Sequence, residues 1–295
     1  MKTIIVPTDF SLHALYALKT AASIAKKTFA QVKIVHAYNF PLSEVHEEIN
    51  FKRFKEQMSA ISEEKLEALS KMSFLEGISV SMYFENEMKP WEIVTDDKYK
   101  NADLIVIGSH GESGYYKQFI GSNTEKIIRM AEAPVLTVKK SDDIFEIKNI
   151  VFASNFHNET YSVFEKIKFF TDLYKTHIDL LKVITPHNFE TTTKSKKSMA
   201  DFVNKFKLFN YTINIFNASN IEKGILDFSS HQKTDLIAIE THGRLGINHI
   251  IGGSLAEKIA DDAILPVLTI KIKKDKKSSN KDHHKTTDYE NWGSE

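Results

Sequence analysis

The chain contains no cysteine, which excludes disulfide bonds, thiolate catalysis and cysteine-bound metal. It also has no apolar run long enough to cross a membrane, and its apolar N-terminus stops at Pro7 and Asp9, too soon for a signal peptide. Its 39 basic and 39 acidic residues leave no net charge, so composition gives no reason to expect membrane or specific nucleic-acid binding. We therefore expect a cytoplasmic protein.

A glycine pattern occurs twice in the chain. The two copies comprise Gly108, Gly111, Gly121 and Ser122 in the first half, and Glu240, Gly243, Gly253 and Ser254 in the second, each 132 residues later. Earlier in the halves the offset is 146 residues, because Asn155 matches Asp9. The second half is therefore shorter, and the missing residues fall between its second and third expected strands.

The length of 295 residues suits two domains of ordinary size. We expect residues 1–140 to form the first domain and residues 148–272 the second, with a connector at 141–148. Residues 273–295 are rich in lysine and poor in apolar side chains, which predicts a disordered basic tail.

Short apolar runs alternate with helical patterns in both halves. We expect strands at 3–6, 32–35, 78–84, 104–107, 135–138, 149–152, 178–183, 211–216, 236–239 and 267–270. Expected helices in the first half are one capped by Ser11, a long one at 44–71, a short one at 91–99 and one from Ser122, where Glu125 completes a capping box. This order predicts an α/β fold with parallel sheets covered on both faces.

The first glycine copy follows an apolar strand and precedes a helix, where open parallel sheets place their ligands. Gly108 and Gly111 would let the backbone approach a phosphate, and the helix start near Gly121 offers unpaired N–H groups. A purely structural turn is the alternative. Asp9 ends the first strand, where its carboxylate can accept hydrogen bonds from a ribose or an adenine amine, or can cap the first helix; the sequence leaves both roles open.

The second copy departs from the first at a telling position. Glu240 replaces Gly108, which puts a carboxylate where a phosphate would lie. Two unit charges about 4 Å apart repel by roughly 4 kcal/mol at an effective dielectric constant of about 20, or about a thousandfold in affinity. Asn155 also replaces Asp9, so the second half is expected to be degenerate.

These residues resemble the universal stress protein family, whose signature is Gly-x2-Gly-x9-Gly-Ser/Thr. The resemblance extends to the first strand (residues 6–11), the second (35–37) and the last (133–138). It implies two Rossmann-like domains of the adenine nucleotide alpha hydrolase type, each a five-stranded parallel sheet of order 3-2-1-4-5 flanked by helices. It also implies pairing through the last strands, either between the halves or in a homodimer.

The resemblance further implies a site for ATP, accompanied by Mg²⁺, in the first half. The residues at matching positions are Pro7, Thr8, Asp9, Ala37 and Ile107 around the adenosine, and Gly108, His110, Gly111, Gly121, Ser122 and Asn123 around the phosphates. We therefore expect a stress-response regulator that binds ATP and acts on a protein partner that the sequence does not identify. A scaffold without nucleotide, or a slow ATPase, is the alternative. The sequence has no P-loop lysine and no serine elbow, so no motif of these kinds points to dedicated catalysis.

The difference between positions 108 and 240 makes a prediction. Gly108→Glu is expected to abolish ATP binding and leave the fold intact, and Glu240→Gly with Asn155→Asp is expected to create or strengthen a second site. Calorimetry with ATP measures both. Wild-type affinity in the first variant would mean that the loop is misassigned, and an unchanged stoichiometry in the second would mean that another feature closes that half.

Overall fold

The computed structural model describes residues 1–39, 48–109, 121–140, 144–157, 160–241 and 252–272. The elements of the first half are β1 (Thr3–Pro7), α1 (Leu12–Thr28), β2 (Gln31–Tyr38), α2 (Glu48–Ser70), η2 (Ser73–Leu75), β3 (Val80–Asn86), η3 (Glu92–Val94), β4 (Leu104–Gly108), α3 (Ser122–Met130) and β5 (Val135–Val138). Those of the second half are β6 (Asn149–Ala153), α4 (Thr160–Tyr174), β7 (His177–Ile184), α5 (Thr192–Phe206), β8 (Tyr211–Asn217), α6 (Ile221–His231), β9 (Leu236–Thr241), α7 (Gly252–Asp262) and β10 (Val267–Lys271).

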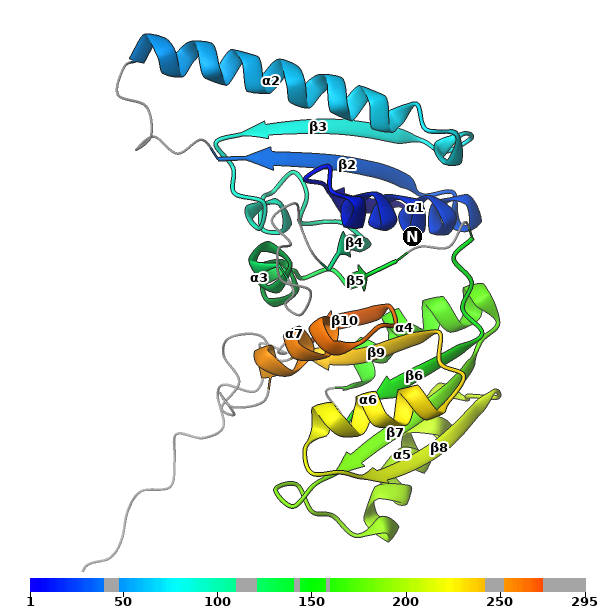
Figure 1. The fold of residues 1–295 in the computed structure, drawn as a ribbon. Coiled ribbons are helices and arrows are strands. Elements are labelled where there is room, and N and C mark those ends of the chain that lie inside the picture. The colour runs from blue at the N-terminus through cyan, green and yellow to red at the C-terminus, as the bar shows by residue number, and fades with distance from the viewer. Residues whose placement is uncertain (40–47, 110–120, 141–143, 158–159, 242–251, 273–295) are drawn as a thin grey trace, which may run out of the picture.

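The strands form one ten-stranded sheet of order β3-β2-β1-β4-β5-β10-β9-β6-β7-β8. Each half contributes five parallel strands in the expected order 3-2-1-4-5. Helices α1, α2, α4 and α5 pack on one face, and α3, α6 and α7 on the other (Figure 1). The α/β fold class is confirmed, and the two sheets are continuous.

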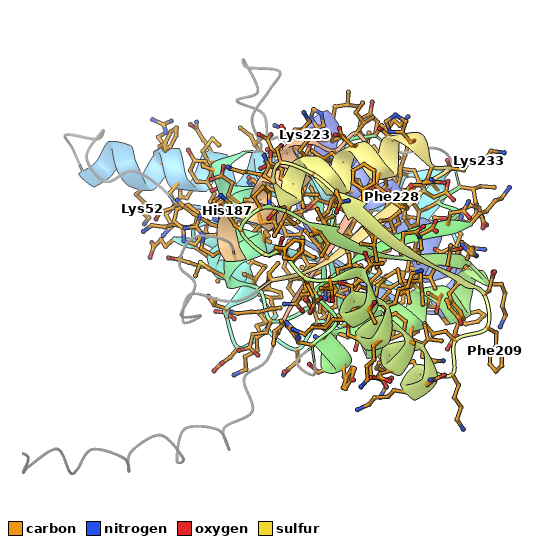
Figure 2. All side chains as sticks on the ribbon, turned by 90° about the horizontal axis from the view of Figure 1, so that it is seen from below. Lys52, His187, Phe209, Lys223, Phe228 and Lys233 are labelled. Carbon is orange, nitrogen blue, oxygen red and sulfur yellow. The ribbon has the colours of Figure 1, made fainter. Side chains whose placement is uncertain are left out.

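Helix packing follows the side-chain pattern. On α6, Phe228 is buried against the sheet, whereas Lys223 on the same helix is exposed (Figure 2). Helix α1 begins as predicted, because the Ser11 side chain accepts a hydrogen bond from Ala14 N (3.2 Å). It ends at Phe29, whose φ of 56° is left-handed and therefore stops the helix. None of the described helices is long and apolar enough to cross a membrane.

Two helix predictions were wrong. The short helix expected at 91–99 is only the 3₁₀ turn η3. The capping box at Ser122 does not form, because the N-cap of α3 is Gly121 and no side chain in the described ranges caps the helix. Gly121 occupies the cap because its N–H donates to Ser109 O (2.9 Å), which fixes how the chain enters α3.

The halves pair through their last strands. Strands β5 and β10 run antiparallel, and Leu136 lies opposite Leu268, its own equivalent 132 residues later. Both leucines are fully buried. The repeat therefore has a local two-fold axis through this pair of residues, and the free edge of each last strand is covered by the other half.

Helices α3 and α7 extend the contact between the halves. Arg129 Nε donates to Glu257 Oε1 (2.8 Å), and Lys139 Nζ donates to the carbonyl of Asp261. Burial and the nearby Glu257 raise the pKa of Glu125 above its usual range. Both bonds therefore run from a cation of the first half to an acceptor of the second, and Glu125 adds an acidic group from the first half.

The position of Leu136 predicts a large stability effect. Leu136→Ala removes a fully buried side chain at the two-fold axis and is expected to cost about 2–5 kcal/mol of unfolding free energy. Urea unfolding measures it. Ile264→Ala is the control, since Ile264 is 73% exposed and its truncation should change stability by no more than about 0.5 kcal/mol. Equal stabilities would contradict a shared core at this strand pair.

Candidate functional site

The candidate site lies where the strand order reverses in the first half. Strand β1 has β2 on one side and β4 on the other. The chain adds β3 outside β2 and β5 outside β4, so the direction in which strands are added reverses at β1. Ligands of open α/β sheets bind at this switch point, beyond the carboxyl ends of the strands. We call the site the carboxyl-end junction, comprising residues 7–9, 37, 107–108 and 121–123. His110 and Gly111 lie outside the described residues.

The end of β1 is a turn that both halves share. Asp9 Oδ1 accepts a hydrogen bond from Ser11 N (3.0 Å), and Asn155 Oδ1 accepts the equivalent bond from His157 N (3.2 Å). Phe10 and Phe156 both have left-handed φ values, 65° and 58°. Because an amide oxygen serves the turn as well as a carboxylate does, the turn does not require the negative charge of Asp9.

His36 lies beside this junction and contacts one of its residues, Thr8, which the sequence did not indicate. Its ring is buried, stacks on Phe84 with centroids 5.7 Å apart, and brings Nδ1 within 2.8 Å of the carbonyl oxygen of Thr8. A carbonyl oxygen can only accept a hydrogen bond, so Nδ1 is the donor and carries a proton. The only available signal was a histidine within an apolar strand, and its partner is 28 residues away.

The alternation of backbone directions along β2 turns the backbone of Ala37 toward the junction. Pairing of β1 with β2 ends at Pro7 and Val35, followed by the bond from Thr8 N to Val35 O (2.9 Å). Since backbone groups alternate along a strand, those of Ala37 face the same side as those of Val35. They therefore point past the end of β1.

Apolar side chains form the α3-facing side of the junction. Ala37 and Ile107 are both buried and belong to the cluster that packs under α3. At the adjoining end of β3, Glu85 accepts hydrogen bonds from Tyr99 Oη and Lys98 Nζ. Burial opposes ionisation of Glu85, but the bonds from Lys98 and Tyr99 outweigh it and lower its pKa. Its charge is thus already neutralised by neighbours.

The start of α3 is held close to the end of β4. Thr124 Oγ1 donates to Gly108 O (3.0 Å), and Gly121 N donates to Ser109 O (2.9 Å). Gly121 thus offers no spare amide. The next two residues, Ser122 and Asn123, are exposed, and among the described residues no side chain caps the helix. Their N–H groups belong to the first turn, where helical partners are lacking and the helix dipole favours an anion.

Gly108 has a packing role that the sequence did not reveal. A Cβ at this position would lie 2.6 Å from both the carbonyl carbon and the oxygen of His13, so α1 crosses too close for any side chain. The expectation that Gly108→Glu leaves the fold intact was therefore wrong. This variant should lose stability together with any ligand, and it cannot separate the two effects.

The second half differs at the equivalent place. Ser154 Oγ donates to Glu240 Oε1 (2.9 Å) and accepts from Phe156 N (2.9 Å). The Glu240 side chain thus bridges the ends of β6 and β9. In the first half the equivalent position is Gly108, which has no side chain to form such a bridge. The acidic substituent expected from the sequence is held in place across the junction.

Metal binding has no dedicated site in the described part of the chain. No group of three histidine, aspartate or glutamate side chains there could hold a metal ion. Mg²⁺ bound with a nucleotide takes most ligands from phosphate oxygens and water, so it needs few from the protein. The expected Mg²⁺ stays a prediction.

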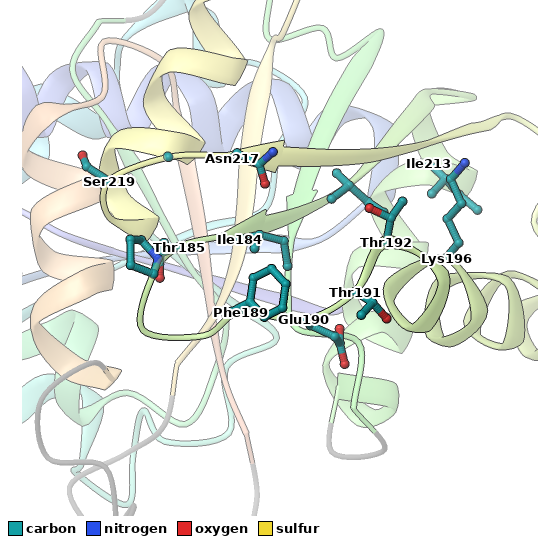
Figure 3. A pocket seen from close by; sticks show the side chains of 13 residues that line it. Ile184, Thr185, Phe189, Glu190, Thr191, Thr192, Lys196, Ile213, Asn217 and Ser219 are labelled. Carbon is teal, nitrogen blue, oxygen red and sulfur yellow. The ribbon is translucent and has the colours of Figure 1, made fainter.

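A cavity of about 930 Å³ lies in the second half, at the edge of the sheet formed by β7 and β8 and beside the start of α5. Phe189, Ile213 and Ile215 line it, with Lys196 and Glu190 at its border (Figure 3). Glu190 accepts hydrogen bonds from Lys182 and Ser195, and chiefly the Lys182 bond lowers its pKa to about 2. Lys182 stands where the first half has His36, so the two halves stabilise this end of the second strand differently.

Comparisons with known proteins agree with this architecture. The model of the universal stress protein family matches residues 1–139. A universal stress protein of Methanocaldococcus jannaschii is 33% identical over 140 residues, covering 47% of this chain and 82% of that protein. Another, of Thermus aquaticus, is 28% identical over 139 residues, covering 47% of this chain and 98% of that protein. The chain belongs to the universal stress protein family.

A solved structure extends the likeness to both halves. The crystal structure of a universal stress protein from Archaeoglobus fulgidus matches with a TM-score of 0.71, covering 92% of this chain and 98% of that chain. Identity is 18%, so the match shows the fold alone. The second half thus has the fold of the first although the family model covers only residues 1–139.

The Lys182–Glu190 pair predicts a pH effect. Glu190→Gln is expected to lower the unfolding free energy at pH 7 by about 2 kcal/mol, because Lys182 loses a charged, largely buried partner. The depressed pKa of Glu190 means that its stabilisation is present above pH ~4.5 and is lost as the pH falls toward about 2. Urea unfolding from pH 7 down to 3 should show that the difference in unfolding free energy between the wild type and Glu190→Gln becomes smaller. Glu76→Gln, on an exposed residue, is the control; a difference independent of pH would contradict the assignment.

Proposed function

We propose that this chain is a stress-response regulatory protein that binds ATP in its first half, with the second half as its structural partner. The observation that carries the proposal is the start of α3, which no described side chain caps and which is held against the end of β4 at the switch point of the sheet. An anion there meets exposed N–H groups and the positive end of a helix dipole.

The other residues of the carboxyl-end junction suit an adenosine. Ala37 and Ile107 offer an apolar surface and Ala37 offers backbone groups, which together suit a base. Asp9 would accept hydrogen bonds from the ribose, beside Pro7 and Thr8. The phosphates would then lie along Gly108, His110, Gly111, Gly121, Ser122 and Asn123, with Mg²⁺ held mainly by the phosphates.

Asp9 supports the proposal most directly among the side chains. Its turn needs only an oxygen acceptor, as Asn155 demonstrates in the same molecule. A carboxylate is therefore more than the turn requires, and it stands in the half where Gly108 places no side chain across the junction.

The second half would act without a nucleotide. Its Glu240 carboxylate bridges to Ser154 across the equivalent junction, so a phosphate would meet both a side chain and a negative charge. Pairing through β5 and β10 gives this half a structural task in any case. In the proposed mode of action, bound ATP biases the surface that a partner protein contacts; the cytoplasmic location stays a prediction.

Asp9→Asn separates ligand binding from folding. The variant should keep wild-type stability, because Asn155 makes the same turn, and should bind ATP at least about tenfold more weakly, since a charged acceptor is lost. Calorimetry gives the affinity and urea unfolding the stability.

Asp172→Asn is the matched control, because it removes one carboxylate from the surface of α4. Wild-type protein that gives no heat with ATP would exclude ATP binding and favour a scaffold without nucleotide. Unchanged affinity in Asp9→Asn would remove Asp9 from the site.

A further inference from the structure

The two halves differ in how far their first and fourth strands are paired. Strand β1 pairs with β4 at two positions, ending at Ile5 and Ile105. Strand β6 pairs with β9 at four positions, ending at Ala153 and Ile239. Under the repeat, the two pairs absent from the first half are those of residues 6 and 7, directly at the carboxyl-end junction.

Backbone directions identify the cause. Asp103 N donates to Thr3 O on the β4 side (3.0 Å), and Thr8 N donates to Val35 O on the β2 side (2.9 Å). Because these directions alternate along a strand, the backbone nitrogen of residue 7 faces β4. This residue is proline, which has no N–H to donate.

The missing donor faces one particular acceptor. Ile105 N donates to Pro134 O on the β5 side (2.9 Å), so the carbonyl of Val106 faces β1 by the same alternation. In a parallel ladder, the bond from residue 7 to this carbonyl would complete both absent pairs. The second half has Ala153 at the equivalent of Pro7, and there the ladder continues.

We infer that Pro7 is a positioning residue for nucleotide: by withholding one ladder bond it keeps the ends of β1 and β4 unpaired, and Ala153 closes the second half by supplying that bond. This inference rests on the proposed ATP site. The Ser154–Glu240 bridge crosses the same two strand ends, so the second half is closed twice, by backbone and by side chain. Removing Glu240 alone leaves the backbone closure in place.

Two substitutions at position 7 separate the donor from the ring. Pro7→Ala adds an N–H and removes side-chain volume, whereas Pro7→Val adds the same N–H and keeps a branched apolar side chain. In the full chain both should bind ATP about tenfold more weakly, and hydrogen exchange should show a protected amide at residue 7. Pro90→Ala is the control, since it relieves the same restriction on the unfolded chain in a turn outside the junction.

The second half supplies the reverse test. Glu240→Gly with Asn155→Asp should still bind one ATP per chain by calorimetry, and adding Ala153→Pro should raise the stoichiometry toward two. This expectation replaces the one drawn from the sequence, in which the double variant sufficed.

The outcomes distinguish the inference from the function it rests on. Wild-type protein that binds no ATP overturns both. Wild-type binding with equal affinity in Pro7→Ala and Pro7→Val overturns the inference alone, as does a second site in the double variant. Loss of affinity in Pro7→Ala that Pro7→Val restores would mean that the ring acts by contact, which also overturns it.

Discussion

The antiparallel pairing of β5 with β10 is the constraint on which the rest of the molecule depends. All four residues of β5 are buried, and so are Val267 to Ile270 in β10. In an isolated half, either strand would present an apolar edge with unpaired backbone groups, which invites association with other chains. Joining the two strands removes both edges at once and merges two cores into one sheet.

Within this shared frame, small local differences make the two junctions unequal. The turns after β1 and β6 have the same backbone shape and the same hydrogen bonds, whether the acceptor is Asp9 or Asn155. The differences lie in the contacts between neighbouring strands. In the first half Pro7 has no N–H to donate to β4, whereas in the second half Ala153 pairs with β9 and the Glu240 side chain bonds to Ser154. Each arrangement fits its own half, since α1 crosses too close to Gly108 for a side chain like that of Glu240.

The sequence predicted the features that depend on local pattern. All ten strands were placed, and Ser11 was recognised as the cap of α1, because strand periodicity and capping chemistry are properties of neighbouring residues. Features set by distant contacts were missed. The close crossing of His13 over Gly108 and the bond from His36 to Thr8 join different elements, so nothing near either residue in the sequence indicates them.

Covalent linkage of the paired halves also fixes how the assembly responds to dilution. A dimer of separate chains dissociates once its concentration falls below its dissociation constant. Here the partner strand is always supplied by the same chain, at an effective concentration set by the connector between β5 and β6. The pair therefore persists in a cell that holds only a few copies, and its asymmetry cannot be lost by exchange of subunits.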